Sequence, residues 1–197
     1  MKLATTLVAL VAVFALAPSM ASAECMINGN ISVEETNSPL GAFTYTLDVT
    51  WDMGSQHGLS HLDLLVDVEN GTCSCDDFAN YISFDAISGS SDGENGCTVD
   101  YYTELACNGD PSIGIEGILF KFEPYEDGCE PGPTGSGSFV FYSDLPGVPV
   151  NEQILALIDK ASQDYCTGTL TGVFPGMACD PVATDGQSLD SLKGLYR

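Results

Sequence analysis

The strict alternation of apolar and polar residues in "AFTYTLDVTWD" (42–52) restricts the fold of this chain more than any other feature. Every odd-numbered residue from 43 to 51 is a large apolar one, and every even-numbered residue from 44 to 52 is Thr or Asp. Successive side chains of a β-strand point to opposite faces of the sheet. The segment is therefore predicted to be a strand with one buried face, and Trp51, the only tryptophan, is assigned to the core.

The segment "SHLDLLVDV" (60–68) repeats this pattern. One predicted face carries Leu62, Leu64, Val66 and Val68, and the other carries His61, Asp63, Leu65 and Asp67. The two histidines of the chain, His57 and His61, are four residues apart, a spacing that places both rings on one face of a helix. Gly58 and the alternation argue against a helix, so His57 is expected in a connection and His61 on the strand.

Several further segments have the composition and period of short strands. They are residues 81–87, 98–105, 117–123, 137–143 and 165–174. In "GILFKFE" (117–123) the period places Leu119, Lys121 and Glu123 outward. Clusters typical of turns separate the segments, at 88–96, 107–112 and 124–137. The predicted fold is an all-β, antiparallel β-sandwich (Ig-like or jelly-roll-like), stapled by disulfides, with at most one short helix.

The segment "NEQILALIDKAS" (151–162) fits two secondary structures. Apolar residues occupy both parities, and Ile154, Leu157, Ile158 and Ala161 form a helical stripe. Periodicity alone favours a short helix.

The first 23 residues are predicted to be a signal peptide. Lys2 is followed by an apolar run at 7–17, and "ASA" (21–23) has the small residues of a cleavage site. Cleavage after Ala23 leaves a predicted β-sandwich domain at 24–180 and a polar tail at 181–197. The apolar run is too short for a permanent transmembrane helix, and we expect no membrane span in the mature chain.

All eight cysteines lie beyond the predicted cleavage site. They are Cys25, Cys73, Cys75, Cys97, Cys107, Cys129, Cys166 and Cys179. An even number of cysteines in an exported chain indicates disulfides. The connectivity does not follow from the sequence, and the pairs expected from sequence proximity are Cys97–Cys107 and Cys166–Cys179.

The net charge of −23 limits the partners of the protein. Such an acidic chain repels nucleic acid and anionic membrane surfaces and attracts cations. If strands 42–52 and 60–68 pair, one outward face carries Asp48, Asp52, His61, Asp63 and Asp67. This face fits a calcium site, which takes oxygen ligands, or a zinc or other transition-metal site that uses the imidazole. Alternating Asp and Thr is also typical of an ordinary solvated sheet face, and this is the interpretation that the sequence favours over either metal site. The loop "SSDGENG" (90–96) lacks the spacing of an EF-hand and is predicted to be a turn.

The sequence gives little support to catalysis. A G-x-S-x-G nucleophile motif and glycine-rich phosphate-binding motifs are missing. Exposed tyrosines could instead stack on sugar rings, and the candidates are Tyr101, Tyr102, Tyr125 and Tyr142. We therefore expect an exported, non-enzymatic β-sandwich module that acts in adhesion, surface structure or extracellular assembly, with an extracellular protein or a glycan as its possible ligand. A carbohydrate-binding or calcium-dependent binding module is the alternative, and a small secreted hydrolase ranks third.

Five segments in order resemble a family of secreted bacterial cell-surface modules. They are "FTYTLDVTW", "LSHLDLLV", "GILFKFE", "GSFVFYSDLPGVPV" and "YCTGTLTG". The resemblance implies a β-sandwich with a role in adhesion or surface structure and no defined catalytic activity. It also implies a strand at 153–160, because Lys160 and Ala161 occupy the place of a Lys-Ala strand end. Leu119 and Phe120 depart from the family pattern, and so do the acidic cysteine loops at 73–77 and 124–130.

The C-terminal "SLDSLKGLYR" resembles a short tail on some exported bacterial proteins. The matching residues are Leu192, Lys193, Leu195, Tyr196 and Arg197, whereas Leu189 and Asp190 replace a tryptophan and a glycine. The resemblance implies a sorting or attachment signal. A frayed amphipathic terminus fits the same residues.

Overall fold

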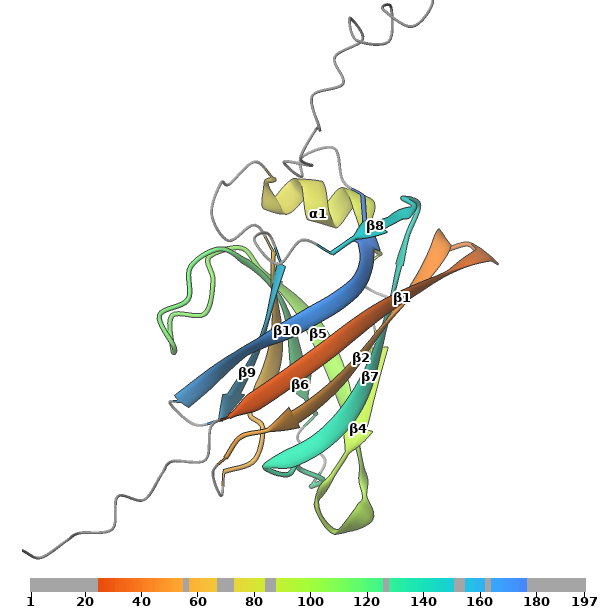
Figure 1. Cartoon of the computed structure of the whole chain (residues 1–197). Helices are drawn as coiled ribbons and strands as arrows, with labels where there is room; N and C mark the ends of the chain where they lie inside the picture. The colour runs from red at the N-terminus through yellow and green to blue at the C-terminus, as the bar shows by residue number, and fades with distance from the viewer. Residues whose placement is uncertain are drawn as a thin grey trace, which may run out of the picture.

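The computed structural model describes residues 25–54, 57–66, 73–83, 88–125, 128–150, 155–161 and 164–176. The predicted signal peptide, the C-terminal tail, Asp67 and Cys179 lie outside these residues. The strands are β1 (Met26–Ser38), β2 (Gly41–Asp52), β3 (His61–Val66), β4 (Ser88–Asp92), β5 (Thr98–Ala106), β6 (Ile118–Pro124), β7 (Thr134–Ser143), β8 (Gly147–Pro149), β9 (Leu155–Ala161) and β10 (Asp164–Pro175). The described part of the chain has one α-helix, α1 (Cys75–Tyr81), and a 3-10 turn at Glu94–Gly96 (Figure 1).

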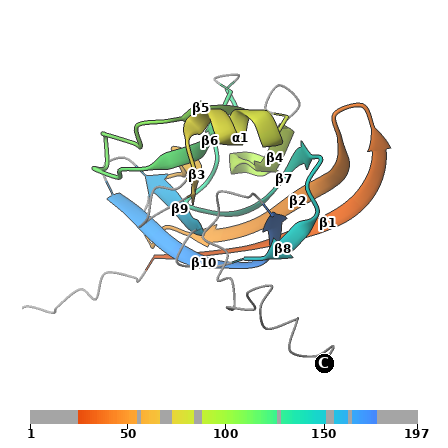
Figure 2. The same ribbon diagram turned by 90° about the horizontal axis from the view of Figure 1, so that it is seen from above.

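All ten strands belong to one sheet, in the order β1-β2-β7-β4-β5-β6-β3-β9-β10-β8. Strand β1 also pairs with β10, and this is the single parallel pairing among the described strands. The pairing of β1 with β10 joins the two sides of the sheet, which therefore curls around an enclosed interior (Figure 2).

The all-β, largely antiparallel character was predicted correctly, but the two facing sheets of an Ig-like or jelly-roll-like sandwich are not observed among the described residues. The physical reason is that alternation identifies which face of a strand is buried and not what covers it. A curled sheet and a sandwich produce the same pattern.

The inward-facing residues form the core as the alternation predicts. Tyr45, Leu47, Val49 and Trp51 are buried, together with Phe120, Phe122, Phe139 and Phe141. The Trp51 Nε1–H donates to the Gly132 carbonyl at 3.1 Å. Helix α1 lies at one end of the curled sheet (Figures 1 and 2), where Phe78 packs edge-on against Phe120 at 5.7 Å between ring centroids.

The structure differs from the local predictions in three places. Residues 75–81 form helix α1, which begins at a reciprocal capping box of Ser74 and Asp77. The end of this helix overlaps the first residue of the strand predicted at 81–87, and residues 84–87 lie outside the described residues. Residues 88–92, predicted as a turn, form β4 between β5 and β7. Gly89 suits this strand because a Cβ there would overlap the Phe139 ring. Residues 155–161 form a strand, as the family resemblance implies and periodicity does not.

Three disulfides connect the described residues: Cys25–Cys166, Cys75–Cys107 and Cys97–Cys129. Cys73 is disulfide-bonded as well. The predicted pairs Cys97–Cys107 and Cys166–Cys179 are wrong, because Cys97 and Cys166 have other partners. Pairing by sequence proximity gave the wrong partner for Cys166, because β1 lies beside β10 and brings Cys25 next to it although the two strands are far apart in the sequence. No helix in the described part of the chain is long and apolar enough to cross a membrane.

Alkaline pH is expected to destabilise the fold through two buried tyrosines. Burial raises the pKa of Tyr45 and of Tyr101 from 10.0 to about 12. Both contributions are complete below about pH 10 and are lost as the pH rises toward about 12, since the unfolded phenols ionise first. Urea unfolding across this range should show a loss of about 2 kcal/mol per tyrosine. The Y45F/Y101F variant should lack this part of the pH dependence; an unchanged dependence would contradict the assignment.

Candidate metal centre

The outward face of β3 is covered by the connection between β5 and β6. Its residues His61, Asp63 and Leu65 are all buried, although strand parity places them away from the core. Leu65 and Leu119 form a second hydrophobic cluster, against which Ala106, Ile113 and Ile115 pack. The connection at 107–117 therefore folds back over β3 and β6 and encloses polar groups beneath it.

Asp110 is held in this connection by its own hydrogen bonds. Its amide donates to the Ile115 carbonyl at 2.8 Å, and the Ile115 amide donates back at 3.1 Å. The amide and hydroxyl of Ser112 both donate to Asp110 Oδ1. The Cys75–Cys107 disulfide anchors the beginning of the connection to α1. Asp110 therefore has one occupied carboxylate oxygen and presents the other, Oδ2, to β3.

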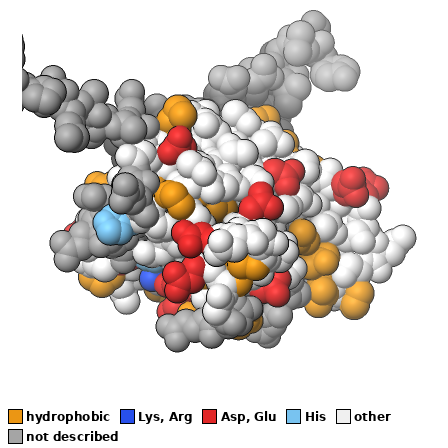
Figure 3. Space-filling model, turned by 90° about the horizontal axis from the view of Figure 1, so that it is seen from below, with side chains coloured by type: hydrophobic (Ala, Val, Ile, Leu, Met, Phe, Trp, Pro, Cys, Tyr) orange, Lys and Arg blue, Asp and Glu red, His pale blue; other side chains and the backbone are white. Residues whose placement is uncertain are grey.

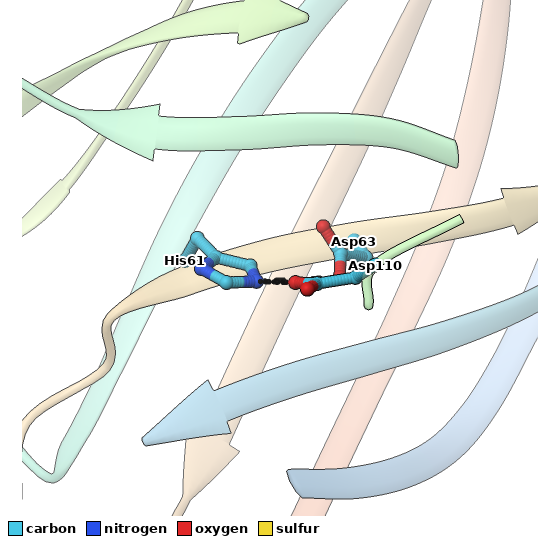
Figure 4. Close-up of side chains that lie close together, drawn as sticks. All are labelled: His61, Asp63 and Asp110. Atoms are coloured by element: carbon cyan, nitrogen blue, oxygen red, sulfur yellow. Dashed lines mark hydrogen bonds and ion pairs between the residues drawn. The ribbon is translucent and has the colours of Figure 1, made fainter. Parts of the chain in front are cut away.

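His61, Asp63 and Asp110 meet beneath the connection (Figure 4). His61 Nε2 lies 2.8 Å from Asp110 Oδ2 and 3.4 Å from Asp63 Oδ2. One ligand atom from each residue lies within 4.8 Å of the other two. His61 and Asp63 converge because they are two residues apart on β3 and so share a face.

Two residues of β6 border this cluster. Lys121 is in register with Asp63 across the β3–β6 pair. The Lys121 ammonium lies 2.6 Å from Glu123 Oε1 and 3.7 Å from Asp110 Oδ2. Glu123 Oε1 lies 3.9 Å from His61 Nδ1, on the opposite side of the ring from the two aspartates. The two nitrogens of His61 therefore face carboxylates on both sides.

Asp63 is the unusual member of the cluster. It is 0% exposed, and neither carboxylate oxygen has a hydrogen-bond partner. The 3.4 Å approach to His61 Nε2 is an ion-pair distance without hydrogen-bond geometry. Burial raises the pKa of Asp63, and the nearby His61 and Lys121 offset only part of that rise. A buried carboxylate without hydrogen bonds is costly unless a cation or a proton accompanies it.

Asp110 has the opposite protonation preference. Burial alone would raise its pKa, but hydrogen bonds from Ser112 and the charges of Lys121 and His61 together lower the pKa to about 2. Asp110 is therefore a carboxylate at neutral pH. The acidic residues around His61, which are Asp63, Asp110 and Glu123, outnumber the single lysine, Lys121.

The structure brings together only part of the metal face predicted from the sequence. Asp48 and Asp52 lie on β2, which pairs with β1 and β7, whereas β3 pairs with β6 and β9. The condition on which the predicted metal face depended, that these two strands pair with each other, is therefore not met. Asp48 is exposed, and the Asp52 carboxylate accepts from the Gly54 amide at 2.9 Å. Asp67 lies outside the described residues.

Asp110 was not among the ligands predicted from the sequence. Its segment, "CNGDPS", was correctly assigned to a turn-rich connection, but nothing in a turn pattern indicates which face the turn will cover. The outward orientation of Lys121 and Glu123 was predicted from parity. The loop at 90–96 contains the end of β4 and a 3-10 turn, and there the Asp92 carboxylate accepts from the Ser136 hydroxyl at 2.8 Å.

The four tyrosines proposed for sugar binding separate into two groups. Tyr101 is buried in the core and its hydroxyl lies 2.8 Å from that of Ser91, and Tyr142 is partly buried. Tyr102 and Tyr125 are exposed and in contact, with ring centroids 5.2 Å apart.

Gly109→Ala is expected to displace Asp110 from the cluster. Gly109 has a φ of +70°, and a Cβ there would overlap the Ile115 carbonyl oxygen. We expect a loss of about 1–3 kcal/mol in the free energy of unfolding, with faster amide exchange over 107–117. Gly114→Ala is the matched control, because Gly114 has the same φ with no atom within 4 Å of the added Cβ. Equal effects of both changes would contradict the importance of this close contact.

Comparison of the sequence with protein-family models and with curated proteins gives no match.

Proposed function

We propose that the protein is an exported, non-enzymatic surface or extracellular structural module in which His61, Asp63 and Asp110 hold a divalent transition-metal ion. The observation that supports this most strongly is the fully buried Asp63 carboxylate, which has no hydrogen-bond partner and points at an imidazole nitrogen. A cation bound there would satisfy both aspartates and would balance the excess of negative charge.

The separations within the cluster suit zinc. Zinc bonds to nitrogen and carboxylate oxygen are about 2.0–2.2 Å long, so ligand atoms of a tetrahedral site lie about 3.3 Å apart. The His61–Asp63 separation is 3.4 Å, and the His61–Asp110 separation of 2.8 Å would need to widen by about half an ångström. Zinc would thus replace the direct His61–Asp110 hydrogen bond with two metal bonds.

Glu123 supports the same assignment. Histidines that bind metals usually direct their second nitrogen at a carboxylate, which fixes the tautomer and the orientation of the ring. Glu123 Oε1 lies 3.9 Å from His61 Nδ1 and would take this role after a small movement. Glu123, His61 and the metal ion would then form the carboxylate–imidazole–metal arrangement that is common at such sites.

Calcium, expected as one option from the sequence, fits less well. Calcium takes six to eight oxygen ligands, whereas this cluster offers an imidazole nitrogen and the carboxylates of two aspartates. Zinc accepts nitrogen and oxygen together in a site with few ligands.

The position of the cluster supports a structural role for the ion. His61, Asp63 and Asp110 are each at most 3% exposed, which leaves no surface on which a substrate could meet the metal. A bound ion would join β3 to the covering connection. The metal would therefore contribute to folding, as structural zinc sites do.

The oxidised cysteines support the exported location. Disulfides form and persist in oxidising compartments, and the three described bridges tie together distant parts of the chain. The surface or adhesive role is proposed from the resemblance of the strand motifs to secreted bacterial cell-surface modules.

Thermal unfolding of chelator-treated protein tests this proposal. Zinc at about one hundred times its dissociation constant stabilises a folded protein by about 2.7 kcal/mol, which for this size raises Tm by about 5–10 °C. Calcium and magnesium should give a smaller shift. H61Q should lose the zinc response, and H57Q, which alters the other histidine, should keep it. An absent response in the wild type, or a full response in H61Q, would overturn the site.

A further inference from the structure

Two exposed tyrosines lie beside a groove at the end of β6. Tyr102 of β5 is 42% exposed and Tyr125, directly after β6, is 51% exposed. Their rings contact at 5.2 Å with an interplanar angle of 51°. The groove measures about 520 Å³, and its lining includes Leu59, Ser60, Pro124, Tyr125, Glu130 and Pro131. A volume of this size is in the range of small-molecule sites.

The walls of the groove are held in place by several contacts. The Cys97–Cys129 disulfide fixes one wall to the start of β5. The Glu94 amide donates to the Glu130 carbonyl at 2.9 Å, and the Tyr125 amide donates to the Asp100 carbonyl at 2.9 Å. The groove is therefore formed before any ligand arrives, which lowers the entropic cost of binding.

The exposure of Tyr125 and Tyr102 distinguishes them from the tyrosines of the core. Tyr45 and Tyr101 are at most 3% exposed and use their hydroxyls within the protein. Tyr125 instead is an exposed residue of the groove lining, and its ring lies against the Tyr102 ring. Single exposed apolar side chains are ordinary, but a supported aromatic ring in a preformed groove is a platform for a flat, partly apolar ligand.

The chemistry of the groove favours a sugar ring. The C–H face of a sugar can lie on Tyr125, while its hydroxyls can donate to the Glu130 carboxylate. The net charge of −23 disfavours anionic ligands. Figure 3 shows acidic side chains spread over one face of the molecule and little basic surface. The nearby Lys121 is already paired with Glu123 at 2.6 Å.

We infer that this groove binds a neutral oligosaccharide, with one sugar ring stacked on Tyr125 and with Tyr102 holding that ring in position. The inference is independent of the metal site, because none of the groove-lining residues belongs to the His61–Asp63–Asp110 cluster.

A panel of immobilised glycans, followed by calorimetric titration of the best neutral oligosaccharide, tests the inference on the full-length protein. Y125A should weaken binding about tenfold or more, the equivalent of one lost stacking contact. Y125F, which keeps the ring, should retain binding within about threefold. Y102A should have a smaller effect, because it acts through the orientation of Tyr125. Tyr165 is 46% exposed on β10, and Y165A is the matched control that should change nothing.

Three outcomes would overturn the inference: no neutral glycan binds, uronic-acid polymers bind better than neutral ones, or Y125A binds as the wild type does. Thermal unfolding of each variant verifies that it folds. Binding should persist after chelation, so failure of the sugar groove and failure of the metal site are separate results.

Discussion

Asp63→Asn is expected to raise the free energy of unfolding of the metal-free protein by about 1–3 kcal/mol and to abolish its response to zinc. The Asp63 carboxylate is fully buried with two unsatisfied oxygens and lies near the ionised Asp110. An amide removes the buried charge, keeps the shape of the side chain and can donate a hydrogen bond. The same change removes a metal ligand.

The two opposite effects make this variant informative. With zinc at about one hundred times the wild-type dissociation constant, the wild type gains about 2.7 kcal/mol and the variant gains little. Urea unfolding with chelator and with zinc measures both quantities. Asp48→Asn, an exposed position on β2, should stay within about 0.5 kcal/mol of the wild type in both conditions. If Asp63→Asn destabilises the chelated protein, Asp63 is a structural partner of His61 and the cost assigned to its charge is wrong.

Gly172→Ala is expected to lower the free energy of unfolding by more than about 3 kcal/mol. Gly172 pairs with Ile31 in the parallel pairing of β10 with β1 that joins the two sides of the sheet. It has a φ of +100°, and a Cβ there would overlap the Ile31 carbonyl oxygen. Backbone strain alone accounts for about 1–3 kcal/mol. The overlap adds to it, because the backbone carbonyl cannot yield without moving β1.

Gly96→Ala separates strain from overlap. Gly96 has a φ of +77°, and no atom lies within 4 Å of a Cβ placed there. This control should therefore lose only the strain of a left-handed backbone, about 1–2 kcal/mol. Chemical unfolding of both variants measures the difference. Similar small losses in the two variants would show that the contact between β1 and β10 is looser than described.

The fold was predictable wherever one face of a strand meets the core. Residues 42–52 and 117–123 became β2 and β6 with the predicted inward sides, because burial of alternate residues dictates strand register. Strand β1 was not predicted, since glycine and short polar residues weaken its alternation. The curling of one sheet and the parallel pairing of β1 with β10 depend on contacts between the ends of the chain, which no local pattern encodes.

Of the candidate site, only the two residues on β3 could be predicted from the sequence. His61 and Asp63 were paired from strand parity, and they do lie together. The metal face also required β2 as the neighbour of β3, and β3 instead pairs with β6 and β9, because strands that follow each other in the sequence need not be neighbours in the sheet. Asp110 enters the cluster through the folding of the 107–117 connection over the sheet. That placement depends on the apolar contacts of Ile113 and Ile115 with Leu65 and Leu119.

The most direct test of the metal site is the amount of zinc bound per chain, measured by equilibrium dialysis of the oxidised protein followed by elemental analysis. The wild type and H57Q should each retain one tightly bound zinc ion per chain, while Asp63→Asn and H61Q should retain none at the same free zinc concentration. A wild type that retains no zinc would contradict a metal centre at His61, Asp63 and Asp110. Equal amounts of bound zinc in the wild type and in Asp63→Asn would contradict it as well.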